Sequence, residues 1–322
     1  MAATTRWMAL LCLAATLALA RPAASQTTII EAPGPEGPLA GAMTGPSGAD
    51  IPVVVIIPGS GPTDRDGNNT YGIRAASYRL IAEGLAGRGI ASVRIDKRGM
   101  FGSARATADG NAVTMDDYGT DIHNWSATIR KLRGARCVWL LGHSEGGLTA
   151  LAAARNPEGI CGLLLASTPG RPLGDVMREQ LRANPANAPL LSQAEGIIAD
   201  LEAGRRVEAG AMHTALLPVF RPAVQGFLIS VLALDPARLL ADYKGPVLIL
   251  QGLSDIQVGR VDAERLHQAR PDTELVLLPK VSHALKAVAS DDRAANLETY
   301  RNPDLPLADG VIDALARFVQ GR

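Results

Sequence analysis

One serine in this chain of 322 residues lies in a sequence context that suits a nucleophile. Residues 142–146 read G-H-S-E-G with Ser144 at the centre, and they follow an apolar run, Cys137–Leu141, that has the length of a buried strand. Small and apolar residues suited to a helix come next. A serine on such a strand–turn–helix junction is lifted out of the chain, and the flanking glycines let backbone segments pass close to it. The pattern predicts nucleophilic catalysis by Ser144.

The serine needs a base, because a hydroxyl is a poor nucleophile until a neighbouring group takes its proton. Three histidines lie downstream of Ser144. His213 falls in a long insertion, and His267 falls in the middle of a predicted helix. His283 follows a predicted strand, where catalytic groups of open α/β sheets gather. We expect His283 to be the base and His143, next to the serine, to have a packing or orienting role.

The base needs a carboxylate that orients its ring. Asp255 follows the apolar strand predicted over residues 246–251, just before the strand that leads to His283. Asp262 and Asp272 flank a predicted helix, so we expect helix caps or solvent-exposed charges there. The order serine, aspartate, histidine, each after a strand, predicts a catalytic triad.

Acyl transfer also needs donors for the developing oxyanion, each worth roughly 2.7–4 kcal/mol. The backbone N–H of Glu145, directly after the serine, is one candidate. The second should come from the loop after the first core strand, where residues 58–61 read P-G-S-G, and we assign it to the Ser60 N–H. This chemistry requires no metal and no cofactor.

Strand-like and helix-like segments alternate through most of the chain. Predicted strands cover residues 27–31, 39–44, 51–57, 90–95, 137–141, 160–166, 246–251 and 273–278. Predicted helices cover residues 76–88, 116–133, the elbow helix to 155, 261–269 and 307–320. The first two strands should form a hairpin. The alternation with short loops predicts an α/β fold with a doubly wound, mostly parallel sheet.

One long stretch breaks the alternation. Between Gly170 and Asp242 there is no strand-like run, only helical segments interrupted by prolines. We predict a core formed by residues 26–170 and 243–322, with residues 171–242 as a helical cap over one edge of the sheet.

The N-terminus resembles a secretory signal peptide. Arg6 precedes an apolar run of 13 residues, Met8–Ala20, which is too short for a stable membrane anchor, and small residues follow. Cleavage after Ser25 would remove residues 1–25 and leave a periplasmic or secreted protein. A buried or amphipathic N-terminal helix is the alternative.

Two cysteines remain after the predicted leader. Cys137 and Cys161 lie at the starts of predicted strands that should be parallel neighbours, roughly 4.8 Å apart. That distance permits a disulfide if both side chains face the same way, and an exported protein would retain it. Two buried free thiols are an equally good expectation.

The composition of the chain indicates which classes of partner to expect. Hydrophobic residues make up 47% of the chain and charged residues 20%, which is typical of a globular core. Lys and Arg together number 32, as do Asp and Glu, so nucleic acid and anionic membrane surfaces are not expected partners. The sequence does not predict an oligomeric state.

Four motifs together resemble the α/β-hydrolase superfamily across nearly the whole predicted mature chain. They are PGSGPTDRDG (58–67), VRIDKRG (93–99), GHSEGG (142–147) and VSHALK (281–286). More narrowly, they are similar to bacterial esterases and to serine aminopeptidase (S33-like) hydrolases. The resemblance implies a nucleophile, an acid, a base and two oxyanion donors: Ser144, Asp255, His283, and the backbone N–H groups of Ser60 and Glu145.

The favoured hypothesis is an exported serine hydrolase that cleaves small-molecule carboxylic esters through an acyl-enzyme. An aminopeptidase of the same fold is the first alternative, and it needs an anionic pocket for the substrate amine, for which Glu179, Glu195 or Glu202 are candidates. A catalytically silent binding protein that keeps the fold is the second alternative.

Charged residues cluster near the predicted site. Asp64, Arg65 and Asp66 follow the oxyanion loop, and Asp96 and Arg98 follow a predicted strand. They are expected to form an ion-pair network that holds the loop, with recognition of a substrate charge as the alternative.

Overall fold

The computed structural model describes residues 27–290 and 292–321. The predicted leader over residues 1–25 therefore lies outside the described residues. Within the described chain, eight strands form one sheet in the order β1-β2-β4-β3-β5-β6-β7-β8. The strands are β1 (Thr27–Ala32), β2 (Leu39–Thr44), β3 (Val53–Ile57), β4 (Ala91–Ile95), β5 (Val138–His143), β6 (Ile160–Ala166), β7 (Val247–Gly252) and β8 (Glu274–Leu278).

The sheet is mixed and mostly parallel. β1 and β2 form the expected antiparallel hairpin, and β2 also pairs antiparallel with β4. All later pairings, from β4 through β3 and β5 to β8, are parallel. The central strands are apolar on both faces, as in the buried run VVVII of β3, because helices cover both sides.

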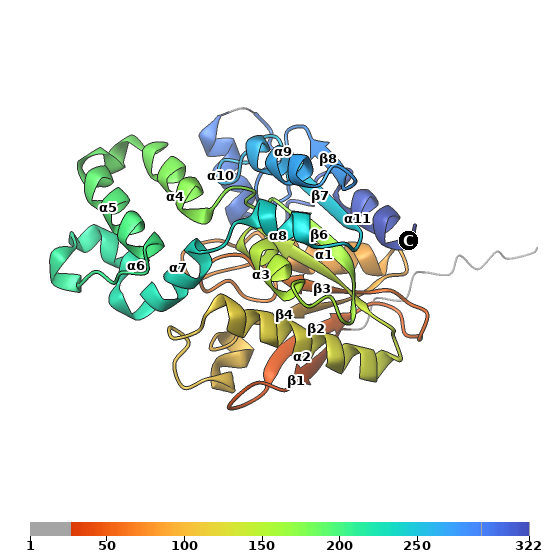
Figure 1. Ribbon diagram of the computed structural model, residues 1–322. Helices are drawn as coiled ribbons and strands as arrows, with labels where there is room; N and C mark the ends of the chain where they lie inside the picture. Colours follow the sequence, from red (N-terminus) through yellow and green to blue (C-terminus); the bar gives the residue numbers. More distant parts are fainter. Residues whose placement is uncertain (1–26, 291, 322) are drawn as a thin grey trace, which may run out of the picture.

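Helices flank the sheet on both faces (Figure 1). The α-helices are α1 (Ser77–Ala86), α2 (Met115–Arg133), α3 (Glu145–Ala153), α4 (Leu173–Arg182), α5 (Leu191–Glu202), α6 (Leu217–Phe220), α7 (Gln225–Leu232), α8 (Pro236–Asp242), α9 (Arg260–Ala269), α10 (Arg293–Arg301) and α11 (Val311–Gln320). One apolar cluster joins the sheet to α2, α3, α8 and α9, and a second joins it to α1 and α11. The predicted doubly wound α/β fold is confirmed.

The stretch predicted as a cap is helical and contains α4 to α8. In Figure 1, α4, α5 and α6 lie beyond one side of the sheet. Their apolar side chains form a third cluster that also includes residues of α2 and α3. By length and composition alone, Thr214–Leu232 is apolar enough to cross a membrane. In the structure it is divided into short helical pieces, with a break at Arg221 directly before Pro222, and Phe220 is buried in the third cluster.

Two helix predictions differ from the structure. The C-terminal helix was expected from Leu307 but begins at Val311, because Gly310 adopts a left-handed conformation with φ 87°. α10 was not predicted, since its sequence RAANLETYR has few apolar residues and its capping residue, Asp292, lies in a polar run.

A disulfide joins Cys137 and Cys161, whose Cα atoms lie 5.2 Å apart. The neighbouring parallel strands β5 and β6 bring the two residues together, as expected, and both side chains face the same way. The open choice between a disulfide and free thiols is thus answered in favour of the disulfide. It closes the loop that carries Ser144.

Reduction of this disulfide is expected to lower the free energy of unfolding by about 3 kcal/mol, because a loop of about 25 residues regains freedom in the unfolded chain. The bond lies at the amino ends of β5 and β6, and Ser144 lies at the opposite end of β5. We therefore expect a thermal midpoint lower by several degrees and a kcat at room temperature within about twofold of the oxidised protein. Melting curves with and without dithiothreitol measure this.

The Cys137→Ala/Cys161→Ala variant serves as the control. Its midpoint should match that of the reduced protein and should not respond to dithiothreitol. An oxidised protein whose midpoint is unaffected by complete reduction would contradict the expected contribution.

Candidate active site

Ser144 lies on a strained turn between β5 and α3. Its backbone has φ 55° and ψ −126°, a combination that side-chain-bearing residues rarely adopt. Two glycines make the turn possible: a Cβ on Gly142 would overlap the carbonyl of Gly146, and a Cβ on Gly146 would overlap the carbonyl of Ile57. The turn presents the Ser144 hydroxyl at the carboxyl edge of the sheet.

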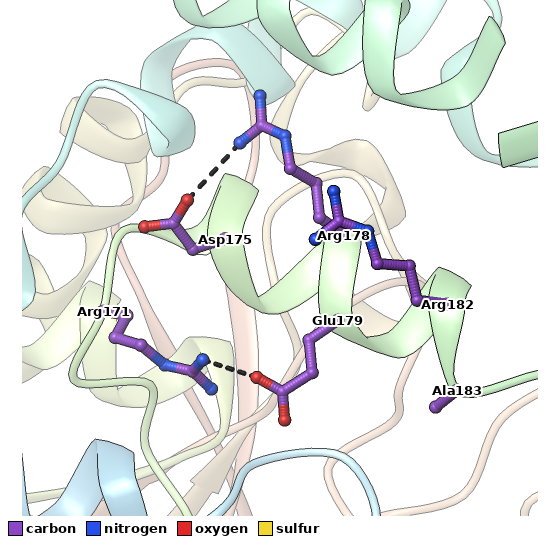
Figure 2. Close-up of a pocket in the computed structure, with 6 residues that line it drawn as sticks. All are labelled: Arg171, Asp175, Arg178, Glu179, Arg182 and Ala183. Atoms are coloured by element: carbon purple, nitrogen blue, oxygen red, sulfur yellow. Dashed lines mark hydrogen bonds and ion pairs between the residues drawn. The ribbon is translucent and has the colours of Figure 1, made fainter. Parts of the chain in front are cut away.

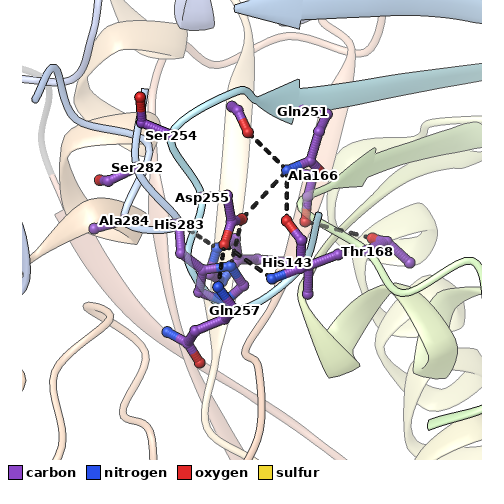
Figure 3. A network of polar contacts seen from close by, with 12 residues as sticks. His143, Ala166, Thr168, Gln251, Ser254, Asp255, Gln257, Ser282, His283 and Ala284 are labelled. Atoms are coloured by element: carbon purple, nitrogen blue, oxygen red, sulfur yellow. Dashed lines mark hydrogen bonds and ion pairs between the residues drawn. The ribbon is translucent and has the colours of Figure 1, made fainter. Parts of the chain in front are cut away.

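Asp255 and His283 are hydrogen-bonded to each other. His283 Nδ1 lies 2.7 Å from Asp255 Oδ2, and the Asp255 side chain is fully buried (Figure 3). The backbone N–H groups of Gln257 and Val258 donate to the other oxygen, Oδ1, at 2.8 and 2.9 Å. Burial alone would raise the pKa of Asp255, but the electrostatic interaction with the His283 ring and these hydrogen bonds lower it below its usual value. Asp255 is therefore held as a carboxylate with a defined oxygen facing His283.

Ser144 and His283 line the same cavity, of about 100 Å³. Among the described residues the Ser144 hydroxyl makes no hydrogen bond, and His283 Nε2 likewise has no partner there. Hydrogen bonds between nucleophile and base are often long without substrate and shorten when it binds. The structure thus brings all three predicted triad residues to one edge of the sheet, with the Asp255–His283 link already formed.

The two predicted oxyanion donors belong to segments that border the nucleophile. Glu145 is the first residue of α3, so its N–H has no acceptor within the helix. Ser60 lines the Ser144 cavity, and the loop backbone approaches the serine so closely that a Cβ on Gly59 would lie 3.2 Å from Ser144 Cβ. The Ser60 N–H also has no hydrogen-bond partner among the described residues.

His143 connects the base to the oxyanion loop. Its Nε2 donates to the His283 carbonyl at 2.8 Å, since a carbonyl can only accept, and this leaves Nδ1 to accept from the Tyr78 hydroxyl at 2.9 Å. The same hydroxyl accepts from the Gly59 N–H at 3.0 Å. Burial, with the nearby His283 ring adding to it, lowers the pKa of His143 to about 3. His143 is thus a neutral orienting residue, in line with the role expected from its position.

The charged residues around the oxyanion loop form ion pairs with one another. Arg65 binds Asp96 through Nε at 2.9 Å and through its backbone N–H, and Asp66 pairs with Arg94. The Asp64 carboxylate accepts from backbone N–H groups of its own loop. The ion-pair network was the preferred expectation for these residues, and it holds the loop against β4.

Arg98 forms a second, separate set of ion pairs. Its guanidinium contacts Asp121 at 2.7 Å and Asp117 at 2.9 Å, both on α2. The arginine therefore joins the end of β4 to α2 and is not free to bind a substrate charge.

The acids considered for an aminopeptidase are already paired with arginines. Glu179 binds Arg171, Glu202 binds Arg178 at 2.6 Å, and Glu195 binds Arg182 at 2.7 Å. These arginines line a hollow of about 520 Å³ along α4. Figure 2 shows its lining residues with the Arg171–Glu179 and Asp175–Arg178 contacts. Its lining shares no residue with the Ser144 cavity.

The expectation for Asp262 was wrong. It is fully buried in the first turn of α9, where it binds Arg171 at 2.8 Å and accepts from the backbone N–H groups of Gly170 and Arg171. The helix pattern could not reveal a partner about ninety residues upstream. Asp272 is largely exposed and pairs with Arg270, in line with the expectation.

Three buried polar residues near the site were not predicted to have a role: Tyr78, Lys97 and Gln251. Lys97 lies in the VRIDKRG motif, which could have pointed to it. Tyr78 lies on α1, outside all of the recognised motifs. The Gln251 side chain donates to the Val258 carbonyl at 2.9 Å and supports the turn that holds Asp255 (Figure 3).

Comparison with known proteins agrees with this architecture. Solved structures with the same fold include Est1E from Butyrivibrio proteoclasticus and an esterase from Thermogutta terrifontis, each with 18% identity, a TM-score of 0.55, and coverage of 91% of this chain and 98% of theirs. A proline iminopeptidase from Mycobacterium smegmatis has 18% identity, a TM-score of 0.59 and the same coverage. Among curated proteins, none matches the sequence.

A family model supplies the assignment. The model described as "Alpha/beta hydrolase family" matches residues 54–296, a range that includes Ser60, Ser144, Asp255 and His283. The chain therefore belongs to the alpha/beta hydrolase family.

Proposed function

We propose that this protein is an exported serine hydrolase that cleaves carboxylic esters of small molecules through an acyl-enzyme on Ser144. The observation that carries the proposal is the buried Asp255–His283 hydrogen bond at 2.7 Å, with His283 lining the same cavity as Ser144. A carboxylate, an imidazole and a serine in this order form the arrangement that activates a hydroxyl.

The proposed reaction has two halves. Ser144 Oγ attacks the acyl carbonyl while its proton passes to His283 Nε2, and Asp255 holds the Nδ1–H and stabilises the resulting imidazolium. The oxyanion accepts hydrogen bonds from the Ser60 and Glu145 N–H groups. When the tetrahedral intermediate collapses, the ester C–O bond breaks and the alcohol leaves with the proton from His283. Water, activated by His283, then hydrolyses the acyl-enzyme and releases the carboxylic acid.

The cavity favours an ester over an aminopeptidase substrate. An aminopeptidase needs a carboxylate to bind the substrate amine, and among the described residues that line the Ser144 cavity there is none. The acids of α4 and α5 are engaged by arginines. Structures of similar proteins carry small ligands: ferulic acid in Est1E, and malate in the Thermogutta terrifontis esterase.

Export is part of the same proposal. The apolar run Met8–Ala20 supports it, as does the disulfide between Cys137 and Cys161, because such bonds persist in oxidising compartments such as the periplasm. N-terminal sequencing of the protein from periplasmic and culture fractions tests it, with a mature chain beginning after Ser25 as the expected result. A protein found only in the cytoplasm with its N-terminus intact would contradict export.

The cavity size predicts a preference for short acyl chains. A cavity of about 100 Å³ is small for a ligand pocket, which suits an acetyl or butyryl group better than a long acyl chain. In a p-nitrophenyl ester series we expect kcat/KM to be at least about tenfold higher for acetate or butyrate than for decanoate, since each poorly accommodated methylene costs about 1 kcal/mol or more.

Amino-acyl p-nitroanilides in the same series provide the contrast. Ester turnover without anilide turnover is the expected outcome. Faster turnover of the anilides would favour the aminopeptidase, and no turnover of any member together with no labelling by a fluorophosphonate would favour a silent binding protein.

A further inference from the structure

A buried lysine lies behind the oxyanion loop. Lys97 follows the end of β4, and its side chain is only 4% exposed. Its Nζ donates to the Gly59 carbonyl at 2.7 Å and lies 3.7 Å from Glu145 Oε1. The ring of Tyr118 lies under the ammonium, with the centroid 5.6 Å away. A charge is costly to bury unless it is paired, so these contacts define where the ammonium sits.

The contact with Gly59 controls the direction of one oxyanion donor. The Gly59 carbonyl and the Ser60 N–H belong to the same peptide unit, and no peptide bond among the described residues is cis. In a planar trans peptide the C=O and N–H point in opposite directions. Because Lys97 holds the carbonyl, the Ser60 N–H must face away from Lys97, and Ser60 lines the cavity that contains Ser144.

Lys97 also contacts the residue that supplies the other oxyanion donor, Glu145. The backbone N–H of Glu145 is the second expected donor, and the Glu145 side chain is buried with 5% exposed. Its Oε1 has no hydrogen-bond partner among the described residues, and Lys97 is the cation it pairs with. One ammonium therefore contacts both segments that supply the donors.

We propose that Lys97 is a positioning residue that sets the geometry of the oxyanion hole, by holding the Gly59–Ser60 peptide on one side and the Glu145 side chain on the other. This inference rests on the proposed function, because an oxyanion hole matters only if Ser144 attacks an acyl carbonyl. The simpler role for Lys97 is to neutralise the buried Glu145 carboxylate, and the two roles make different predictions.

Two variants separate these roles with p-nitrophenyl butyrate as substrate. Lys97→Met leaves Glu145 buried without a cation, so both the thermal midpoint and kcat should fall. Lys97→Met/Glu145→Gln removes both charges, so the midpoint should recover, whereas kcat should stay about 10²-fold below wild type with KM within about threefold, the pattern of a misplaced oxyanion donor. Recovery of kcat together with the midpoint would overturn the inference.

Lys286→Met is the matched control. Lys286 is also a buried lysine that donates to a backbone carbonyl, that of Asn302 at 2.6 Å, and it contacts neither oxyanion segment. We expect a lower midpoint with kcat within about threefold of wild type. A loss of kcat in Lys286→Met as large as in the double variant would mean that any buried lysine has this effect, and it would overturn the specific role of Lys97.

A trifluoromethyl ketone inhibitor provides a readout of the oxyanion itself, because its adduct with a serine carries an oxyanion in the place of the tetrahedral intermediate. In Lys97→Met/Glu145→Gln its affinity should fall by about the same factor as kcat/KM. Unchanged affinity beside a reduced kcat would overturn the inference. Turnover that persists in Ser144→Ala would instead overturn the proposed function, so the two failures are distinguishable.

Discussion

Replacement of Ser144 by alanine is expected to lower kcat for p-nitrophenyl butyrate by roughly 10⁴- to 10⁶-fold. The hydroxyl is the only group the proposed mechanism uses to form the acyl-enzyme, and the remaining activity would come from the oxyanion donors and substrate binding alone. The fold should be unaffected, because the Ser144 hydroxyl makes no hydrogen bond among the described residues and alanine meets the same backbone strain at φ 55°. Steady-state kinetics and a melting curve of the same preparation measure both effects.

Ser92→Ala is a suitable control for the loss of a serine hydroxyl. Ser92 is fully buried in β4, and its Oγ also has no hydrogen-bond partner among the described residues. Its kcat should stay within about twofold of wild type. A Ser144→Ala variant that keeps more than about a tenth of the wild-type kcat would rule out Ser144 as the nucleophile, since loss of a single triad residue lowers kcat by far more than tenfold.

The second large effect is expected from Asp255→Asn, for which we predict a loss of about 10⁴-fold in kcat. Two backbone N–H groups, of Gln257 and Val258, donate to Oδ1, so the amide oxygen of an asparagine must occupy that position. Its NH₂ group then faces His283 Nδ1, which must accept instead of donate. The imidazole proton moves to Nε2, and His283 can no longer take a proton from Ser144.

Asp262→Asn tests whether loss of any buried carboxylate has this effect. The side chain of Asp262 is as buried as that of Asp255, but it binds Arg171 and lies outside the Ser144 cavity. We expect a lower thermal midpoint with kcat within about threefold of wild type. If Asp255→Asn fell no further in kcat than Asp262→Asn, the orienting role assigned to Asp255 would be wrong.

The fold and the candidate triad were accessible from the sequence because they depend on short-range patterns. Apolar runs mark the parallel strands, and Ser144, Asp255 and His283 each follow such a run. Parallel strands place their carboxyl ends at one edge, so residues far apart in sequence are expected at one site. The proximity of Cys137 and Cys161 follows from the same reasoning, whereas the direction in which their side chains point does not.

The features missed by the sequence analysis depend on contacts between distant side chains. The bridge through Tyr78 and His143 needs helix α1, the end of strand β5 and two loops to meet, and no spacing in the sequence encodes that. The burial of Asp262 depends on Arg171, and the position of Lys97 depends on a carbonyl 38 residues earlier. Helix α10 was missed because its polar sequence has no clear apolar face.

The measurement that tests the central claim most directly is covalent labelling with a fluorophosphonate, followed by mass spectrometry of the peptides. The proposed mechanism predicts a single stoichiometric adduct on Ser144, loss of esterase activity in proportion to labelling, and no adduct in Ser144→Ala or in the heat-unfolded protein. An adduct on a different residue, or unlabelled Ser144 in a preparation that still hydrolyses p-nitrophenyl butyrate, would contradict it.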